Sequence, residues 1–564
     1  MNRNLMMALA AVLALGGMVH AQRQVHKLVA SDPEPFDEFG CSVAIDGEWA
    51  AVSAPNEDEL VDQSGAVYIF HLVGGVWVET QKLKASDASF GMILGESIAM
   101  SGDMLVVGAA WDSSSGLGGA GSVYVFERFG TTWTETAKVT ASDPEQEAFF
   151  GRCVATSGYR IAVSAVLDDA NAVDSGAVYV FDRVGGNWVE TVKLVASDAE
   201  AFDVLGTSLG LLGDTLLVGM AGKEGPGGDG QGAAYVYEKG PTGWMETKKL
   251  LAPDGATSDH FGTSVGLQTG RALVGAPAKD HPVNVGLGGA VYVFEKSGTD
   301  WAQTQEYWPD DNRSGDQFGV RLVVASDRLI VTAHNDDNWG SAYHFSLSGS
   351  TWIQAGKLLY DDPAMSDVFG CSVAMSAETV IVGVMGDDDG CTPPCESGSA
   401  YIFHIAPTAI QFGHCPTAAP CANYDTHGGC RNSTGEGSIL AAAGTGSVTT
   451  DELQLEATHV PPGKLALLFM APAQAYVPYG DGIRVVKAQA GVALYRLGAI
   501  TADATGSVLR GPDIVAQTQN LPAPGHIQAG QTWRFQMWHR DSVSQGPCHT
   551  GTNFTNGVAV AFGP

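Results

Sequence analysis

Basic residues are scarce in this sequence. The chain of 564 residues contains 30 lysines and arginines against 62 aspartates and glutamates, a formal net charge of −32 at pH 7. A chain this acidic repels nucleic-acid phosphates and anionic lipid headgroups, so we expect no nucleic-acid partner. Charged residues make up only 16% of the sequence, whereas 45% is hydrophobic and 72 residues are glycine. This balance argues against a coiled coil or a disordered chain and favours compact, turn-rich β structure.

Long apolar runs are absent after the N-terminus. The chain opens with Arg3, an apolar stretch over residues 5–19 and the small residue Ala21, which is the order of a secretory signal peptide and its cleavage site. The stretch is shorter than the roughly 20 residues that a bilayer-spanning helix needs, so we predict no transmembrane segment. We therefore predict a signal peptide over residues 1–21 and an exported protein that is periplasmic, on the cell surface or extracellular.

Cysteine is rare in the first two thirds of the chain. Only Cys41 and Cys153 precede residue 370, and the other seven of the nine follow it. Export permits disulfides, and an odd count leaves at least one thiol unpaired. His414 and His427 lie among the late cysteines, which leaves zinc as an alternative, although the spacing matches no established zinc motif. The disulfide candidates are the two cysteines that flank the CTPPC loop and four more with three possible connectivities: Cys391, Cys395, Cys415, Cys421, Cys430 and Cys548.

Internal repeats organise most of the chain. A Phe-Gly-x-Ser-Val element, in strict or relaxed form, recurs at spacings of 51 to 57 residues, and each copy is followed by a hydrophobic segment, a variable loop and a Gly-x-x-Tyr-x-Phe segment. Alternation of apolar residues at period two predicts strands. The element indicates seven units, with its glycine at Gly40, Gly95, Gly151, Gly206, Gly262, Gly319 and Gly370.

A fourth segment of each unit begins at a tryptophan, as in WVETQKL from Trp77, and it occurs only six times. A related segment, VHKLVASD from Val25, stands ahead of the first unit. An N-terminal strand that completes the last unit closes a ring and leaves no exposed sheet edge. We therefore predict a seven-bladed β-propeller over residues 22–405. A linear solenoid is the alternative, but it needs capping repeats at both ends.

These repeats resemble the FG-GAP repeat family, the integrin-α-like β-propellers. The resemblance rests on FGCSVAIDG at Phe39, VVGAA at Val106, FGTSVGLQTG at Phe261 and LVGAP at Leu273, and it covers roughly residues 25–405. It implies a propeller and a role in extracellular binding or adhesion. The family also carries calcium in DxDxDG-type loops between the first two strands of a repeat. Here short turns join those strands, so the resemblance assigns no calcium ligand to this chain: IDGE at Ile45, SGDM at Ser101 and LGDT at Leu212.

Acidic residues concentrate in the loops that follow the outer and the second strand of each unit, and these loops share one face of a propeller. Such a face attracts cations or basic partners. Five aspartates that recur after the Lys-Leu strands are best explained as turn caps. Non-repeating acids are better candidates for Ca²⁺, which takes six to eight oxygen ligands. Solvated loop charge is nevertheless the favoured explanation, since the regular spacing of a calcium-binding loop is absent. The candidate metal ligands are Asp336, Asp337, Asp387, Asp388 and Asp389.

A second domain is predicted over residues 406–564, where the repeats stop. Short alternating segments separated by turn signals are typical of a β-sandwich, here with the disulfides proposed above. Trp533 and Trp538 lie on one such segment and are candidate ligand-binding residues for a carbohydrate. Alternate aromatics on a strand are more often part of a hydrophobic core, so that alternative stays open.

We expect from these features an exported, non-enzymatic binding or adhesion protein that uses the acidic loop face, with Ca²⁺ as a possible cofactor and an extracellular protein or glycan as partner. Two Gly-x-Ser-x-Gly matches, from Gly206 and Gly262, fall at the repeated inner-strand position, where the strand-to-helix elbow of a hydrolase has no place. A carbohydrate-active or other hydrolytic enzyme is the alternative, because paired carboxylates supply acid and base. A structural envelope protein is the third class.

Overall fold

The computed structural model describes residues 20–281, 286–309, 311–348, 350–360, 362–364, 367–388, 395–405, 410–412, 438–443, 448–449, 451, 453–479, 482–487, 494–529, 531–540 and 552–562. The predicted signal peptide therefore lies outside the described residues except for His20 and Ala21, which belong to strand β1 (His20–Arg23). None of the helices in the described part of the chain has the length and hydrophobicity of a membrane-spanning segment.

Repeated four-stranded antiparallel sheets make up residues 43–404, as the alternating pattern predicts. In each sheet the strands lie in sequence order, from an inner strand to an outer one. The first four sheets are β3 (Val43–Asp46), β4 (Trp49–Ala54), β5 (Ala66–Val73) and β6 (Val76–Leu83); β7 (Ile98–Ser101), β8 (Met104–Ala109), β9 (Ser122–Phe129) and β10 (Thr132–Val139); β11 (Phe150–Ser157), β12 (Arg160–Ala165), β13 (Ala177–Val184) and β14 (Asn187–Leu194); and β15 (Ser208–Leu212), β16 (Thr215–Met220), β17 (Ala233–Gly240) and β18 (Gly243–Leu250).

The last three sheets follow the same plan with two additions. The fifth and sixth sheets are β19 (Ser264–Gln268), β20 (Arg271–Ala276), β21 (Ala290–Ser297) and β22 (Asp300–Tyr307); and β23 (Phe318–Ala325), β24 (Arg328–Ala333), β25 (Ser341–Ser348) and β26 (Thr351–Leu359), with the short helix η1 (Asp336–Asn338) between β24 and β25. β1 pairs in parallel with β26. The seventh sheet has three consecutive strands, β27 (Phe369–Ser376), β28 (Thr379–Val384) and β29 (Ser399–His404).

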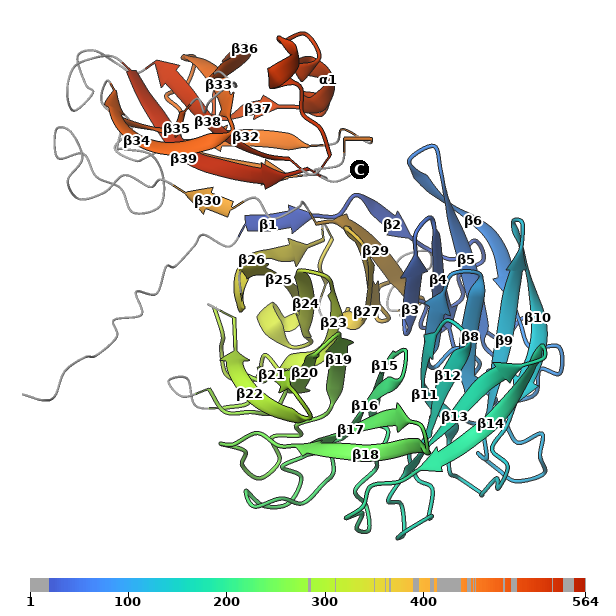
Figure 1. Ribbon diagram of the computed structural model, residues 1–564. Helices are drawn as coiled ribbons and strands as arrows, with labels where there is room; N and C mark the ends of the chain where they lie inside the picture. The colour runs from blue at the N-terminus through green and yellow to red at the C-terminus, as the bar shows by residue number, and fades with distance from the viewer. Residues whose placement is uncertain are drawn as a thin grey trace, which may run out of the picture.

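The N-terminus supplies the fourth strand of the seventh sheet. β2 (His26–Leu28) pairs antiparallel with β29, with His26 opposite Ile402 and Leu28 opposite Ala400. Each pair of successive sheets also shares a cluster of buried hydrophobic residues. One further cluster contains Ile381 of the seventh sheet and Val52 of the first. The sheets accordingly follow one another around a ring (Figure 1).

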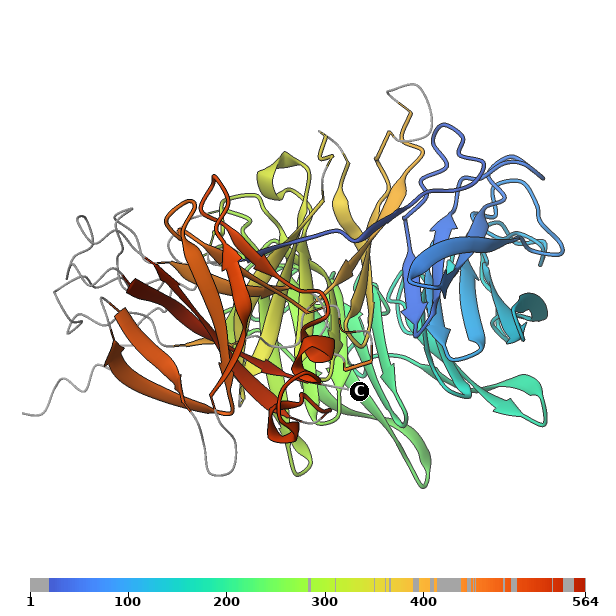
Figure 2. The same ribbon diagram turned by 90° about the horizontal axis from the view of Figure 1, so that it is seen from above.

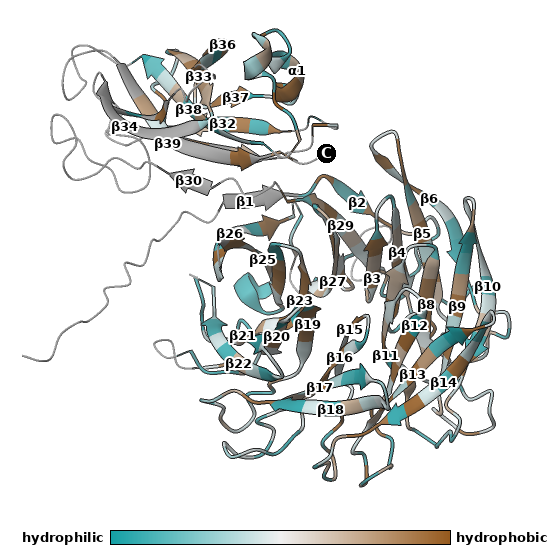
Figure 3. Ribbon diagram, viewed as in Figure 1, coloured by the Kyte–Doolittle hydropathy of each residue, from teal (hydrophilic) through white to brown (hydrophobic). Residues whose placement is uncertain are grey.

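Hydrophobic residues concentrate on the second and third strands of the sheets, which are coloured mainly brown and white in Figure 3. Every residue of β4 and of β8 is buried, whereas the outer strand β6 alternates between buried and exposed positions. Seen from above in Figure 2, the ring is viewed across its thickness, and the connecting loops lie at its two opposite sides.

Glycines allow neighbouring sheets to approach at the inner strands. Gly40 has a φ of +98°, and a Cβ atom there would lie 2.2 Å from the carbonyl oxygen of Ser399. Gly383 of β28 faces the same junction, where a Cβ atom would lie 1.9 Å from the carbonyl oxygen of Gly40. No side chain fits at such distances, so both glycines of the repeat are required for close contact between sheets.

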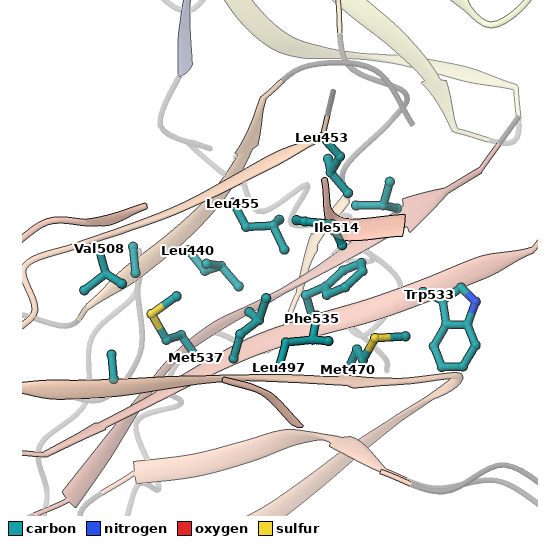
Figure 4. Close-up of a cluster of buried hydrophobic side chains, with 14 of the residues drawn as sticks. Leu440, Leu453, Leu455, Met470, Leu497, Val508, Ile514, Trp533, Phe535 and Met537 are labelled. Carbon is teal, nitrogen blue, oxygen red and sulfur yellow. The ribbon is translucent and has the colours of Figure 1, made fainter. Parts of the chain in front are cut away.

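The C-terminal region forms a five-stranded sheet in the order β30 (Ile410–Phe412), β39 (Thr552–Ala561), β38 (Thr532–Arg540), β33 (Leu465–Ala471) and β36 (Tyr495–Thr501); a three-stranded sheet of β31 (Ile439–Ala443), β32 (Gln454–Thr458) and β37 (Val508–Arg510); and the hairpin of β34 (Ala473–Tyr479) and β35 (Gly482–Lys487). Its helices are α1 (Ile514–Thr518) and η3 (Ala523–Gly525). One buried cluster joins the two larger sheets, with Leu440 and Leu455 from the smaller and Met470 and Phe535 from the larger (Figure 4).

Candidate functional site

Two sets of loops lie together on one side of the sheets. Lys223, after the second strand of the fourth sheet, binds Glu200 in the preceding outer-to-inner loop at 2.9 Å. The backbone N–H of Asp169 likewise donates to Glu145 at 3.1 Å. We define the loop face as the described residues of both sets: 29–42, 55–65, 84–97, 110–121, 140–149, 166–176, 195–207, 221–232, 251–263, 277–281, 286–289, 308–309, 311–317, 334–340, 360, 362–364, 367–368, 385–388 and 395–398.

A tyrosine and a lysine support this face in six of the seven sheets. Tyr68 of β5 faces Lys82 of β6, and the Lys82 Nζ atom lies 5.1 Å from the centroid of the Tyr68 ring. Both side chains donate to the carboxylate of Asp32, at 2.8 Å and 2.6 Å respectively. The other five pairs are Tyr124 with Lys138, Tyr179 with Lys193, Tyr235 with Lys249, Tyr343 with Lys357 and Tyr401 with Lys27.

The five recurring aspartates that the sequence suggests as turn caps are the acceptors of this network. Besides Asp32, each accepts a hydrogen bond from the tyrosine of the following sheet at 2.6 to 2.9 Å: Asp87, Asp143, Asp198 and Asp254. The network holds the outer-to-inner loops against the sheets, so these aspartates are structural. A repeated Tyr and Lys were visible in the sequence, but their pairing depends on strand register, which the sequence alone did not give.

A second carboxylate completes most of these networks. The third residue after the second strand is acidic in five sheets, where it lies buried beneath the loops: Glu57, Asp112, Asp168, Asp336 and Asp387. It is lysine in the other two, and these lysines bind a buried aspartate three residues before the Phe-Gly glycine. Lys223 binds Asp203 at 2.9 Å, and Lys279 binds Asp259 at 3.3 Å. In both arrangements opposite charges are brought together in a buried place, as buried charges require.

Three sheets depart from this balance. Asp37, Asp316 and Asp367 occupy the position of Asp203 and are equally buried. In these sheets, however, the third residue after the second strand is a carboxylate and not the lysine that binds Asp203. None of the three aspartates forms an ion pair with a basic residue of the described chain. Burial is the largest cause that raises the pKa of all three, and neighbouring carboxylates add to it. The pKa of Asp37 is raised to about 6.

The predicted metal ligands of the sixth sheet lie beside cations. The Asp336 carboxylate accepts from Tyr343 and from Lys357, each at 2.5 Å. Burial would raise the pKa of Asp336, but the bonds from Lys357 and Tyr343 outweigh it and hold that pKa below its usual range. Asp337 binds Lys357 at 3.0 Å and Arg313 at 2.9 Å.

The predicted ligands of the seventh sheet that the structure describes also have partners within the protein. Asp387 accepts from Ser399 at 2.6 Å and lies 2.9 Å from Lys27. Asp388 accepts the backbone N–H groups of Cys395 and Glu396, and Asp389 lies outside the described residues. Calcium at these positions stays a prediction, and it would compete with lysines already bound to Asp336 and Asp387.

Within the described part of the chain, one group of three potential ligands has its oxygens within 4.8 Å of one another: Asp32, Glu57 and Glu59. Two lysines already lie among these carboxylates. Lys82 Nζ is 2.6 to 3.0 Å from all three, and Lys84 Nζ is 2.6 Å from Glu59 and 3.0 Å from Glu57. The group is therefore an ion-pair network within the protein.

The structure corrects the carbohydrate prediction for Trp533. Its side chain is only 3% exposed, belongs to the core of the C-terminal region and donates its indole N–H to Gln531 at 2.9 Å. A buried ring offers no face to a sugar. Trp538 is half-buried, and ligand binding there stays a prediction.

Of the disulfide candidates, Cys395 is described and is disulfide-bonded. Cys391, Cys415, Cys421, Cys430 and Cys548 lie outside the described residues, so the pairing among the candidates stays a prediction. Cys41, Cys153 and Cys371 are free thiols.

Exposed carboxylates remain on the loop face after these pairs are formed. The basic residues of the face are Lys84, Lys223, Lys279 and Arg313, and each already forms an ion pair. The exposed acids of the face that form no ion pair with a described residue are Glu34, Asp58, Asp62, Glu147, Asp169, Glu224, Asp229, Asp280 and Glu396. The loop face therefore presents uncompensated negative charge.

Comparison with known proteins places this geometry in a wider group. A family model described as "FG-GAP repeat" matches residues 23–70, 77–126, 133–181, 188–237, 244–294 and 352–403, which together make up just over half of the chain. Each matched segment runs from the outer strand of one sheet to the third strand of the next. The unmatched interval between the last two contains β22, where Glu306 replaces the lysine that faces a tyrosine. No curated protein matches the chain.

Proposed function

Because the chain belongs to the FG-GAP repeat family, we propose that it is an exported, non-enzymatic binding or adhesion protein whose loop face contacts a basic extracellular partner. The observation that carries this proposal is the set of exposed acids left without ion pairs on one face, while every basic residue of that face is already paired. Such a surface attracts a cationic partner over several ångströms and speeds its association.

The proposal includes a rigid support for the face. We propose that the repeated sheets are seven blades of a closed β-propeller and that the C-terminal strands form a β-sandwich. The pairing of β2 with β29 and the cluster shared by the seventh and first sheets support a closed ring. The cluster shared by the five-stranded and three-stranded sheets supports a sandwich. A closed ring fixes the loops relative to one another, which a contact surface needs.

A cationic probe tests the charge requirement. We would measure binding of an oligolysine peptide at several salt concentrations to the parent chain and to a variant with Asp58→Asn, Glu147→Gln, Asp169→Asn and Asp280→Asn. A control variant removes the same number of charges outside the loop face, through Glu48→Gln, Asp214→Asn, Asp300→Asn and Glu456→Gln. We expect about tenfold weaker binding for the first variant at low salt and less than twofold for the control.

Equal weakening in both variants would contradict a localised contact surface, because it would reflect net charge alone. Turnover of aryl glycosides or esters that is lost in the loop-face variant would instead establish the hydrolytic alternative. Binding of the peptide without turnover, lost only in the loop-face variant, is the result that the proposal requires.

A further inference from the structure

An open pocket lies between the outer strands of the second and third sheets, away from the acidic groups just discussed. Its volume is about 440 Å³, and its lining comes mainly from β10, from residues 140–142 after it, and from the β13–β14 hairpin. The outer strands β10 and β14 lie at the perimeter of the ring (Figure 1). The volume of the pocket falls within the range of small-molecule sites.

The pocket arises at one position of the repeat. In β6 this position is Gln81, opposite Ile69. Its side-chain amide crosses to the next sheet, where it contacts the backbone of Trp133. It donates to the Trp133 carbonyl oxygen at 2.7 Å and accepts from the Trp133 backbone N–H at 2.9 Å. The equivalent residue of β10 is Ala137, opposite Val125. An alanine side chain is too short to cross, so the space before the third sheet stays open.

The other sheets follow the same rule. Lys248 of β18 reaches Asp300 at 2.5 Å, Gln305 of β22 reaches the carbonyl oxygen of Ser350 at 2.6 Å, and His26 of β2 reaches that of Gly75 at 3.2 Å. The β14 residue is Val192 and the β26 residue is Gly356, which are short like Ala137. At this position a long polar residue crosses to the next sheet and a short apolar one does not.

The burial of the outer-strand tryptophans depends on whether such a residue crosses. Where a long polar side chain crosses from the preceding sheet, the tryptophan of the sheet that it reaches is buried. The exposed fractions of Trp77, Trp133, Trp301 and Trp352 are 7%, 1%, 4% and 2%. Those that follow Ala137 and Val192 are only half-buried, namely Trp188 and Trp244. The truncation at Ala137 therefore uncovers the side chain of Trp188, which lines the pocket.

The polar groups around Trp188 are one ion pair, one further carboxylate, a hydroxyl and an amide. Glu127 pairs with Arg183 at 2.6 Å, and the carboxylate of Glu190 accepts both the N–H and the hydroxyl of Ser142, at 3.0 Å and 2.9 Å. The side chain of Asn187 adds an amide to the lining. An indole beside several hydrogen-bond donors and acceptors suits a ligand that has an apolar face and a hydroxylated edge.

We propose that this pocket binds a single pyranose residue, with Trp188 against the sugar face and the Glu127–Arg183 pair bonded to its hydroxyl groups. The inference does not depend on the unpaired acids of the loop face, because none of them lines the pocket.

The test substitutes Ala137, the residue whose short side chain leaves the pocket open. Ala137→Gln should close the pocket with the bridge that Gln81 makes, and Val192→Gln makes the same change one sheet later as a matched control. We would titrate the full chain with the methyl glycosides of glucose, galactose, mannose, fucose and N-acetylglucosamine, following binding by calorimetry and ligand-observed NMR. The sugar that binds would be retested at the non-reducing end of a disaccharide, to separate a free sugar from the terminal residue of a glycan.

We expect at least one glycoside to bind, Ala137→Gln to weaken it at least tenfold without lowering the melting temperature, and Val192→Gln to leave affinity within twofold. Trp188→Ala serves as the second variant if Ala137→Gln fails to fold, and it should abolish binding. Binding of none of the five glycosides would overturn the proposal. Unchanged affinity in Ala137→Gln or in Trp188→Ala would overturn it as well, because the sugar would then bind elsewhere.

Discussion

Gly275 of the fifth sheet lies against the inner strand of the sixth. A Cβ atom on Gly275 would lie 2.1 Å from the carbonyl oxygen of Gly319 and 2.4 Å from the Ser264 hydroxyl. We expect Gly275→Ala to lower the free energy of unfolding by about 1–3 kcal/mol, since backbone must move to admit the methyl group. Urea unfolding measures the change. Gly118→Ala is the control, because nothing lies within 4 Å of its added Cβ, and a loss as large there would contradict the steric explanation.

Asp37 provides a test of buried charge. Its pKa is about 6 against an ordinary value of 3.8, so between these pH values the folded chain binds a proton that the unfolded chain has released. The free energy of unfolding therefore falls as pH rises through this window. Asp37→Asn removes the charge and keeps an oxygen for the Glu34 N–H. We expect it to raise stability at pH 7 by about 1–2 kcal/mol and to leave stability at pH 4 nearly unchanged.

Asp203→Asn is the matched comparison in the fourth sheet. Asp203 occupies the same repeat position but binds Lys223 at 2.9 Å, so its loss leaves a buried ammonium group with one carboxylate fewer. We expect this variant to be less stable at pH 7 by about 1–3 kcal/mol. Thermal unfolding at pH 4 and pH 7 measures both variants, and a shift of the same sign in the two would show that the lysine does not decide the effect.

At the scale of the element, β2 is the strand on which the proposed closure of the ring depends. Leu28 is 3% exposed in the cluster that joins the seventh sheet to the first, and Leu83 of β6 is 3% exposed in the cluster between the first sheet and the second. Leu28→Ala and Leu83→Ala should each cost about 2–4 kcal/mol if β2 is held as firmly as an internal strand. Calorimetric unfolding compares them. A much smaller cost at Leu28 would mean that the terminal strand frays and leaves β29 as an open edge.

Repeat spacing and strand alternation were enough to predict the sheets and the donation of β2, because the absent seventh tryptophan segment had a counterpart at Val25. The parallel strand β1 was not predicted, since residues 20–23 carry no repeat signature. The ion-pair network was missed because it depends on which tyrosine faces which lysine. Aligning the repeats would have identified Ala137 as a short residue at a position where four of the seven sheets have glutamine, lysine or histidine, but not the size of the pocket beside it.

At the scale of the whole molecule, the net charge of −32 attracts any divalent cation without a specific site. We expect Ca²⁺ and Mg²⁺ at about 5 mM to raise the melting temperature by similar small amounts, because each would screen surface carboxylates and neither would easily displace Lys357 from Asp336. Scanning calorimetry makes the comparison. A rise that is specific to Ca²⁺, saturates and is lost in Asp337→Asn would instead establish the predicted calcium site.

The pairing of β2 with β29 also determines when during folding the seventh sheet can be completed. His26 meets Ile402 only after 376 further residues have been synthesised, so one of the first segments to emerge has its partner among the last strands of the repeat region. Closing so long a loop is entropically costly and slow compared with forming the local hairpins. Until then β2 and the edge of β29 that faces away from β28 are unpaired and able to associate with other chains. Assembly of the repeat region therefore ends with a single late docking step, and a chain truncated before β29 would never reach it.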